Sequence, residues 1–282
     1  MECINCNAVF QYPFPTPTEI REFYPDDYSA YKKLDKPKQH RYSDLSVLHY
    51  KCGYTHLHVP WLFRLLASMI SAFRQRDVIP FVPNGKALDI GCGNGKFMRT
   101  MNSIGWQFEG VEFNPVAVEI CHKAGLKVFH GDLKSATFKD NSFDLISARH
   151  IIEHIPDPKN FMGEIARILK NGGRIVIRTP NSQALGRRWF GTKWFANEVP
   201  RHLILYNLHN LNMLAERHGL RLIIEKTFTT PKIILNSWDY LIKNRDTPSK
   251  KSKICRLIAL PYVILATLLH RGDEIFAIYE KS

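Results

Sequence analysis

A glycine-rich turn followed by an acidic residue is the part of the sequence whose spacing most clearly predicts chemistry. An apolar stretch passes into this turn, and then into a helical pattern near Lys96, in the run Leu88-Asp89-Ile90-Gly91-Cys92-Gly93-Asn94-Gly95. Glycine lets a ligand approach the backbone and allows a positive φ, and amides at a helix start can meet a carboxylate or phosphate. Glu112 follows ~20 residues after the first glycine, where a carboxylate can accept both hydroxyls of a ribose. We therefore predict a nucleotide-type binding site at this turn.

The glycine spacing argues against a nicotinamide dinucleotide as the ligand. A dinucleotide fingerprint has its third glycine one residue later, where this chain has Lys96, and it does not require Asp89 on the preceding strand. Phe113, next to Glu112, could cover the face of an adenine ring. A lone glycine motif would be better interpreted as an ordinary turn, so the prediction depends on further motifs in register with this one.

The composition supports one main folded domain that positions this turn. Of the 282 residues, 45% are hydrophobic and 23% are charged, which is the balance of a globular protein with a core. Apolar runs alternate with helical patterns, and this alternation predicts a parallel sheet. The predicted strands are residues 87–90, 108–111, 127–129, 143–147 and 174–178, followed by a helix at 208–217 and strands at 220–228 and 274–279. We expect the last two strands to form an antiparallel edge.

Two helices within this alternation have recognisable ends. Asn114 and Asp157 can each cap the amides of a first helical turn, and a proline follows each of them at the first helical position. Gly172 and Gly173 are predicted to end the second of these helices.

Taken together, these motifs resemble those of class I S-adenosylmethionine-dependent methyltransferases. That class has the order Asp-x-Gly-x-Gly-x-Gly, an acid after the second strand and Gly-Asp after the third, here Gly131-Asp132-Leu133. The resemblance covers residues 86–282 and includes Phe143-Asp144-Leu145, the segment Glu153-His154-Ile155-Pro156-Asp157-Pro158, and residues 167–173. It implies a Rossmann-like α/β fold with a seven-stranded, mostly parallel sheet, an antiparallel last strand and helices on both faces. It also implies S-adenosylmethionine as the cofactor.

The resemblance assigns roles in cofactor binding to particular residues. The three glycines would face the methionyl part, Glu112 the ribose, Asp132 with Leu133 the adenine edge, and Ala148 with Arg149 the methionyl group. The predicted cofactor-binding residues are Asp89, Gly91, Cys92, Gly93, Gly95, Glu112, Phe113, Asp132, Leu133, Ala148 and Arg149.

Three histidines are the candidates for a catalytic base. Methyl transfer from a sulfonium is an in-line displacement, so a base is needed only if the acceptor must lose a proton. His154 is the first candidate, because in related small-molecule enzymes its segment borders the acceptor pocket and an imidazole titrates in a useful range. The alternative is that His154 only holds its loop by a hydrogen bond. His202 is the second choice, in a Trp- and Arg-rich insertion resembling a segment that covers the acceptor pocket, and His150 has a weaker claim.

No metal is predicted at this site. Some quinone-pathway relatives have a metal-binding acid cluster in the same loop, but here His150 replaces its first acid. A separate Cys3-Ile4-Asn5-Cys6 motif resembles the remnant of an N-terminal zinc ribbon. A structural zinc ion normally needs four ligands, so Cys52, His56 or His58 would have to complete it. Whether Cys3 and Cys6 bind zinc is left open.

The predicted organisation has three parts. Residues 1–55 form an irregular segment, residues 56–83 a helix and linker, and residues 84–282 the cofactor-binding domain with insertions at about 181–206 and 230–272. The helix is expected at 58–76, where apolar residues recur at three- and four-residue spacing.

Charge and apolar patterning predict location and partners. The N-terminus has no secretory leader and six scattered cysteines do not form a disulfide framework, so we expect a cytoplasmic protein. The net charge of +13 favours anionic partners. Residues 254–269 are apolar but shorter than the ~20 residues of a bilayer span. They predict either a helix buried near the acceptor pocket or an interfacial helix whose basic flank, Lys250, Lys251 and Lys253, meets anionic lipid at the inner face of a membrane.

The leading hypothesis is a methyltransferase acting on a hydroxyl of a glycan, glycolipid or quinone-like small molecule, which could be anionic or lipid-linked. An RNA methyltransferase is the enzymatic alternative, since the net charge and the arginine-aromatic insertion suit a phosphate backbone and stacked bases. Nucleic acid is disfavoured because no RNA-binding module is recognisable and Arg149-His150-Ile151 replaces the Asn/Asp-Pro-Pro-aromatic signature. A non-catalytic cofactor-binding module is the third possibility. The sequence does not indicate an oligomeric state.

Overall fold

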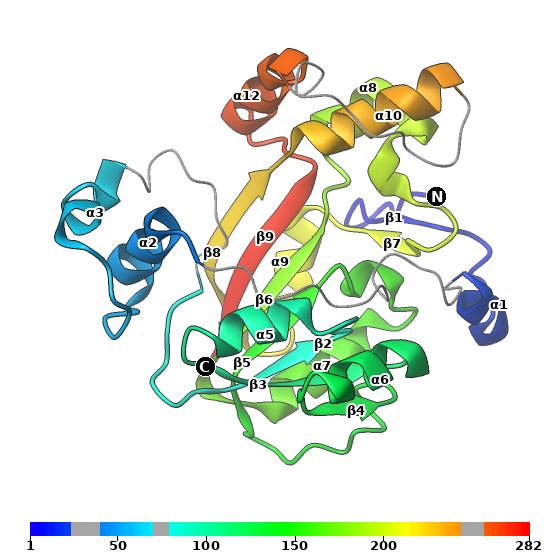
Figure 1. Cartoon of the computed structure of the whole chain (residues 1–282). Coiled ribbons are helices and arrows are strands. Elements are labelled where there is room, and N and C mark those ends of the chain that lie inside the picture. Colours follow the sequence, from blue (N-terminus) through cyan, green and yellow to red (C-terminus); the bar gives the residue numbers. More distant parts are fainter. Residues whose placement is uncertain (24–39, 70–78, 244–256) are drawn as a thin grey trace. The chain divides into compact units, whose positions relative to one another are not determined.

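The computed structural model describes residues 1–23, 40–69, 79–243 and 257–282 (Figure 1). The chain divides into two compact units. Unit 1 consists of Met1–Pro25, Ala148–Arg167 and Arg174–Ser282, and unit 2 consists of Asp26–Ser147 and Ile168–Gly173. Seven strands form one sheet in the order β4-β3-β2-β5-β6-β9-β8. The mostly parallel sheet with an antiparallel strand at the end of the chain agrees with the prediction.

Unit 2 contains the first half of the alternating strands and helices. Its elements are α2 (Tyr42–Cys52), α3 (Trp61–Leu65), β2 (Lys86–Ile90), α5 (Lys96–Asn102), β3 (Gln107–Glu112), α6 (Pro115–Lys123), β4 (Val128–His130) and the first part of β5 (Phe143–Arg149). β2 pairs in parallel with β3, and β3 pairs in parallel with β4. Leu88, Ile90, Val111 and Leu145 are buried in its core. The predicted strands therefore lie where the apolar runs placed them, to within two residues.

Unit 1 contains the second half of the sheet and the insertions. Its elements are β1 (Val9–Phe10), α1 (Pro17–Glu22), the 3₁₀ helix η2 (Ile152–His154), most of α7 (Pro158–Ile168), the second part of β6 (Leu169–Pro180), α8 (Leu185–Phe190), η3 (Gly191–Lys193), η4 (Phe195–Asn197), β7 (Ile204–Leu205), α9 (Leu208–Glu216), β8 (Leu220–Phe228), α10 (Pro231–Lys243), α12 (Leu260–Leu268) and β9 (Glu274–Lys281). β9 pairs antiparallel with both β6 and β8. The expected antiparallel pairing of the last two strands is confirmed.

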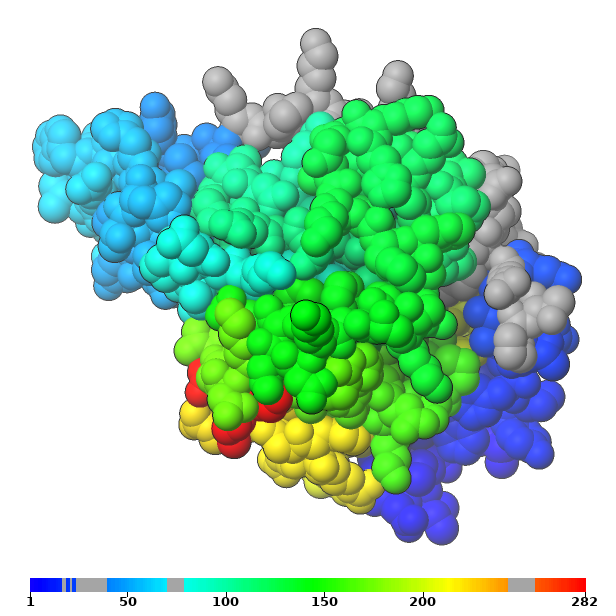
Figure 2. Space-filling model, turned by 90° about the horizontal axis from the view of Figure 1, so that it is seen from below, coloured from blue at the N-terminus to red at the C-terminus, as the bar shows by residue number. Residues whose placement is uncertain are grey.

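The N-terminal residues pair with the first insertion. β1 and β7 form a two-stranded antiparallel sheet in which Val9 lies opposite Leu205. The side-chain amide of Asn210 also donates to the carbonyl oxygen of Cys6 at 3.2 Å. Figure 2 shows the dark blue N-terminal residues bordering the yellow segment around residue 210.

Two predicted features of the helices differ from the structure. α2 lies inside the segment predicted to be irregular. The sequence did not indicate this helix, because its buried positions include Asp44 and Ser46 and so form no apolar stripe. α7 ends at Ile168, four residues before Gly172, and residues 169–173 already belong to β6. Gly173 is required there for close packing, since an added Cβ would lie 3.0 Å from the carbonyl oxygen of Phe143.

Other local predictions have mixed outcomes. Asn114 caps α6 by accepting from the amide of Ala117 at 3.0 Å, and Asp157 accepts from the amide of Asn160 at 3.1 Å at the start of α7, so both predicted caps are confirmed. Of the helix predicted at 58–76, the structure shows α3 and a further turn at 67–69, and residues 70–78 lie outside the described residues. Within the described ranges, no helix combines the length and apolar character needed to cross a bilayer.

Candidate functional site

The glycine turn of unit 2 has the backbone conformation that the sequence predicts. β2 ends at Ile90, and Gly91, Gly93 and Gly95 have φ angles of 64°, 53° and 74° before α5 begins. These left-handed conformations favour glycine. Gly95 is further restricted, because an added Cβ would collide with Leu126 and lie 2.9 Å from Cys121 Sγ. At its three glycine positions the turn therefore presents backbone without a side chain.

Glu112 ties this turn to the end of β3. Its carboxylate is buried and accepts from the amide of Gly93 at 2.8 Å and from the amide of Asn114 at 3.0 Å. Burial raises the pKa of Glu112, and hydrogen bonds from the amides of Asn114 and Gly93 partly offset this increase. Each carboxylate oxygen has two lone-pair sites, so the anchored group can still accept hydrogen bonds from hydroxyl groups. This set of acceptors and amides fits the diol of a ribose, as S-adenosylmethionine requires.

The other residues predicted to bind the cofactor vary in their surroundings. Asp89 and Leu133 are buried, and Phe113 exposes its ring. Cys92 is buried beside Cys121, and its thiol pKa is raised by their hydrogen bond and by burial, so it stays protonated. Asp132 accepts from the amide of Ser135 at 2.7 Å, which lowers the pKa of its carboxyl.

Ala148 and Arg149 lie at the end of β5 and belong to unit 1, so their place beside the methionyl group stays a prediction. Sequence reasoning did not select Ser147, the last residue of β5 within unit 2. Its Oγ is buried without a hydrogen-bond partner in the part of the chain that the structure describes.

In unit 1, Glu153 is the centre of a buried acid-histidine cluster. It lies in η2, and its Oε2 accepts from Thr179 Oγ1 of β6 at 2.9 Å. Its Oε1 is 3.4 Å from His150 Nδ1 and 4.0 Å from His202 Nε2. Burial by itself would raise the pKa of Glu153. The close approach of His150 and the charges of the three surrounding histidines outweigh burial and lower it to about 2.

The pKa values of His154 and His202 are shifted in opposite directions. His154 Nδ1 is 2.9 Å from the carbonyl oxygen of Arg201, which makes Nδ1 the donor and Nε2 the basic nitrogen. Burial lowers the pKa of His154, so its neutral form is favoured at pH 7. His202 has an acceptor at both nitrogens, the carbonyl oxygen of Ala196 at 2.8 Å and Glu198 Oε2 at 3.0 Å. Burial opposes its charged form, but the hydrogen bond to Glu198 and the charge of Glu153 raise its pKa.

The charges of this cluster balance without a bound metal. Glu153 and Glu198 are anionic, His202 favours the cation, and Arg201 Nη2 is 2.6 Å from Glu198 Oε1. Among the described residues, Glu153, His154 and His202 do form a group that could hold a metal ion, with ligand atoms within 4.8 Å of one another. A protonated His202 would repel such an ion, so the predicted absence of a metal stays our expectation.

His150 has a different environment from the other two histidines. It has a positive φ of 56°, and its Nε2 is 3.7 Å from Glu274 Oε1 while its Nδ1 faces Glu153. Its backbone amide donates to the carbonyl oxygen of Arg178 at 2.7 Å. These contacts with two carboxylates are those of a residue that holds the loop, which agrees with its weaker claim as a base.

The N-terminal cysteines are not part of this cluster. Cys3 and Cys6 are free thiols in a turn where the amide of Asn7 donates to the carbonyl oxygen of Cys3 at 2.9 Å. No third metal-type ligand joins them in the described ranges of the chain. His56 is one of the residues proposed to complete a zinc site. Its Nε2 is 3.0 Å from the carbonyl oxygen of Ile104 in unit 2. Zinc binding by these cysteines stays untested.

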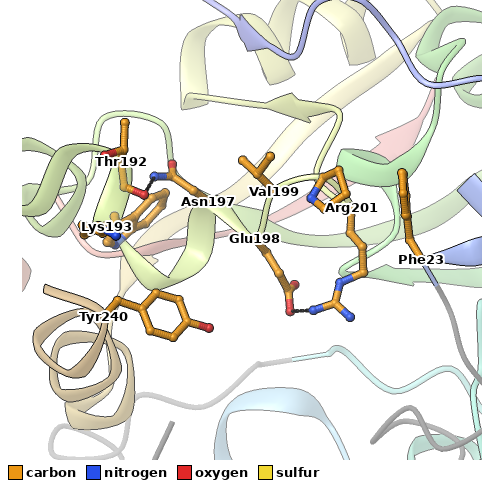
Figure 3. Close-up of a pocket in the computed structure, with 10 residues that line it drawn as sticks. Phe23, Thr192, Lys193, Asn197, Glu198, Val199, Arg201 and Tyr240 are labelled. Carbon is orange, nitrogen blue, oxygen red and sulfur yellow. Dashed lines mark hydrogen bonds and ion pairs between the residues drawn. The ribbon is translucent and has the colours of Figure 1, made fainter. Parts of the chain in front are cut away.

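A cavity of about 410 Å³ in unit 1 shares Glu198 with the cluster, and none of the three candidate histidines is among its lining residues. Figure 3 shows Tyr240 of α10 and Phe23 at opposite ends of this pocket, with the Glu198–Arg201 ion pair between them. It is lined by Phe23, Thr192, Lys193, Trp194, Asn197, Glu198, Val199, Pro200, Arg201 and Tyr240. Aromatic rings with a net charge of +1, from Lys193 and the Glu198–Arg201 pair, suit an acceptor with a ring and negative charge. Sequence reasoning located the insertion but did not select Glu198, Tyr240 or Phe23.

The comparisons with known proteins identify the family. A family model described as a methyltransferase domain matches residues 60–225, more than half of the chain. The chain therefore belongs to the methyltransferase domain family, and the predicted class and its cofactor, S-adenosylmethionine, are confirmed.

Curated relatives match part of the chain. Ubiquinone biosynthesis O-methyltransferase of Xanthomonas oryzae is 30% identical over 127 residues, which are 41% of this chain and 52% of the relative. The mitochondrial protein of the same name from Schizosaccharomyces pombe is 27% identical over 128 residues, 42% of this chain and 45% of the relative. The chain thus spans about half the length of the curated relatives it matches.

Solved structures share the fold. A methyltransferase from Archaeoglobus fulgidus, described as dependent on S-adenosylmethionine, is 20% identical with a TM-score of 0.52, covering 77% of this chain and 92% of its own. The [4+2]-cyclase SpnF is 16% identical with a TM-score of 0.50, covering 87% of this chain and 97% of its own. These likenesses confirm the Rossmann-like fold class. Because one of the two is described as a cyclase, the fold by itself does not specify methyl transfer.

Proposed function

We propose that this chain transfers the methyl group of S-adenosylmethionine to a hydroxyl of a small-molecule acceptor of the glycan, glycolipid or quinone-like class, with His154 as the general base. The observation that carries the proposal is the cluster in which a neutral imidazole lies next to the buried carboxylate of Glu153. The names of the curated relatives, which describe oxygen methylation in ubiquinone biosynthesis, support the hydroxyl acceptor.

The proposed chemistry divides the work between side chains. S-adenosylmethionine would supply a sulfonium-bound methyl group and leave as S-adenosylhomocysteine. Glu112 and the amides of the glycine turn would bind and orient this cofactor. His154 Nε2 would accept the proton of the acceptor hydroxyl as its oxygen takes the methyl group. The carboxylate of Glu153 stabilises the imidazolium that results, and His202, a second-choice base, is less suited because its cationic form is favoured.

The pocket of unit 1 supports a ring-bearing, anionic acceptor. Because Arg201 is paired with Glu198, Lys193 gives the lining a net charge of +1, and Phe23 and Tyr240 supply aromatic surface. A cytoplasmic location at the inner face of a membrane, with a lipid-linked acceptor, is the more specific form of this proposal. The RNA alternative is not favoured, since the matched relatives are named for a small-molecule pathway.

The proposal is tested by methyl transfer from isotope-labelled S-adenosylmethionine to separate panels of catechols and hydroquinones, glycolipids, and RNA. We expect label on a hydroxyl of the first or second panel, together with release of S-adenosylhomocysteine. Labelled RNA would assign the runner-up function instead. Calorimetric binding of S-adenosylmethionine without transfer to any panel would indicate a non-catalytic module.

A further inference from the structure

Three helices of unit 1 present an apolar surface that the proposed reaction does not use. α10 contacts both α8 and α12, and Figure 1 shows the three helices grouped beyond the ends of β8 and β9. Ring contacts join them further, since the ring centroids of Trp189 and Tyr262 are 5.4 Å apart and those of Phe190 and Trp238 are 6.2 Å apart. The surface, called here the apolar face, consists of Trp189, Trp238, Leu241, Ile242, Leu260, Ile264, Leu265, Leu268 and Leu269.

The apolar face is the outer side of helices whose inner sides are fully packed. Phe190, Ile233, Ile234, Tyr262 and Ala266 belong to one buried cluster beneath it. The buried carboxylate of Asp273 accepts hydrogen bonds from Trp194 Nε1 at 2.7 Å, from Tyr262 Oη at 2.8 Å and from Thr229. Because these contacts fix the inner sides, the outward residues cannot turn into the core. They stay exposed, Leu268 by 71%, Ile264 by 59% and Trp238 by 55%.

The exposed charges beside the apolar face are positive among the described residues. Arg188, next to Trp189 on α8, and Arg271, two residues after Leu269, are exposed, whereas Asp239 and Asp273 are buried. The predicted basic flank, Lys250, Lys251 and Lys253, lies outside the described residues. Tryptophans beside aliphatic residues and next to cations are the pattern of a helix at the surface of an anionic bilayer.

We propose that the apolar face of α8, α10 and α12 binds the surface of an anionic lipid bilayer, with α12 lying in the plane of the headgroups. α12 has nine residues, which is too short to span a membrane and long enough to lie on one. Of the two interpretations of this apolar segment, its exposure favours the interfacial one, although Tyr262 and Ala266 on its inner side are buried.

This inference deepens the proposed function through α10. The same helix supplies Tyr240 to the pocket and Trp238, Leu241 and Ile242 to the apolar face. A protein bound through this face would hold its pocket wall at the lipid surface, which favours a lipid-linked acceptor among the proposed classes. That last step rests on the proposed function, whereas membrane binding does not.

Flotation with vesicles tests membrane binding without any turnover. We expect the purified protein to float with vesicles of phosphatidylcholine and phosphatidylglycerol, less with phosphatidylcholine alone, and less at high salt. The double substitution Ile264→Glu with Leu268→Glu should lower the partition coefficient by about tenfold or more, because it removes apolar area from the lipid. Leu65→Glu is the matched control, since Leu65 is exposed by 68% on α3 of unit 2 and should leave flotation unchanged.

Charge reversal tests the second half of the inference. Arg188→Glu with Arg271→Glu should reduce binding to the phosphatidylglycerol vesicles several-fold, while Lys139→Glu, at an exposed lysine of unit 2, should not. Unaltered melting temperatures would show that each variant folds.

Three outcomes would overturn the inference. Equal flotation of the wild type and the apolar double variant would do so, and so would loss of flotation in Leu65→Glu. A lipid-free dimer that the double variant abolishes, seen by sedimentation velocity, would assign the face to a second copy of the chain. If the protein floats with the vesicles but transfers no methyl group, only the proposed function is contradicted.

Discussion

The glycine turn of unit 2 and the acid-histidine cluster of unit 1 are built in different ways. The turn is made of consecutive backbone groups, with one carboxylate, Glu112, that binds the amide of Gly93. The cluster is made of side chains from three separate segments, namely Glu153 with His154, Thr179, and Glu198 with His202. A site made of backbone needs glycine at fixed positions, whereas a site made of side chains needs distant segments to meet. The first kind of site can therefore be recognised from local sequence, and the second depends on the tertiary fold.

If the turn acts through its backbone, a side chain at its centre should have the largest effect on cofactor binding. Gly93→Arg should raise the Kd for S-adenosylmethionine by about 100-fold or more, because the added side chain occupies the space that the ligand needs to approach the backbone. Isothermal titration calorimetry measures this change. Gly125→Arg is the control, since Gly125 also has a positive φ of 73° but an added Cβ meets no atom within 4 Å. Normal binding by Gly93→Arg would show that the ligand does not approach this turn.

If the cluster supplies the base, His154→Ala should affect turnover and not cofactor binding. We expect kcat to fall by about 10²- to 10⁴-fold, the usual contribution of a general base, with the Kd for S-adenosylmethionine unchanged. The wild-type rate should fall on the acid side of a midpoint below 6.5, because burial lowers the pKa of His154 and the base must be neutral. Unchanged turnover in His154→Ala would leave this histidine with the loop-holding role alone.

Glu112→Ala should produce a smaller loss of cofactor binding than the substitution at Gly93. The carboxylate anchors two backbone amides and is proposed to accept hydrogen bonds from the ribose hydroxyls, and hydrogen bonds to a charged group contribute about 1.5–3 kcal/mol. The Kd should therefore rise by about 10- to 100-fold. An equal loss for adenosine and for S-adenosylmethionine would place the effect at the ribose. A loss confined to S-adenosylmethionine would contradict the proposed role of Glu112.

These two regions also show how far the sequence predicts the structure. The apolar runs located β2, β3 and β5 because buried parallel strands consist of such runs, and the caps at Asn114 and Asp157 are local chemistry. The helix α2 was missed because its buried positions include polar residues.

The partners within the cluster were beyond local inference for a different reason. Glu198 and Tyr240 lie far along the chain from His154, and only the tertiary fold brings Glu198 to His202 and Tyr240 to the pocket. The candidate base could thus be named from its motif, while the groups that set its pKa could not.

The ionic structure of the cluster should appear in the pH dependence of stability. The pKa of Glu153 is lowered from 4.5 to about 2, so this carboxylate contributes stability above pH 4.5 that is lost as the pH falls toward 2. The contribution is on the order of 3 kcal/mol. His202 has a raised pKa and acts in the opposite direction, since its contribution is lost as the pH rises through that raised value.

Melting curves of the wild type and Glu153→Gln measure the contribution of the carboxylate. Their difference in Tm should narrow as the pH falls from 4.5 toward 2. The exposed pair of Glu119 and Lys123 on α6 supplies the control, because Glu119→Gln should give a much smaller and salt-sensitive difference. A difference in Tm between wild type and Glu153→Gln that does not change with pH would mean that Glu153 is not ionised in the folded protein.

Removal of metal ions should have the smallest effect of all. It tests whether the cluster holds a proton on His202 or a metal ion. Glu153, His154 and His202 present metal-type ligand atoms within 4.8 Å of one another, but His202 has an acceptor at each ring nitrogen and so favours a proton. Dialysis against EDTA should therefore leave both kcat and Tm unchanged, and added Co²⁺ should give no visible absorption band. Turnover could instead be lost after chelation and restored by a divalent metal in the wild type but not in His202→Ala. That result would show that the cluster holds a metal ion and not a proton on His202. The proposed base would then have to be sought outside the cluster, because His154 would be one of the ligands.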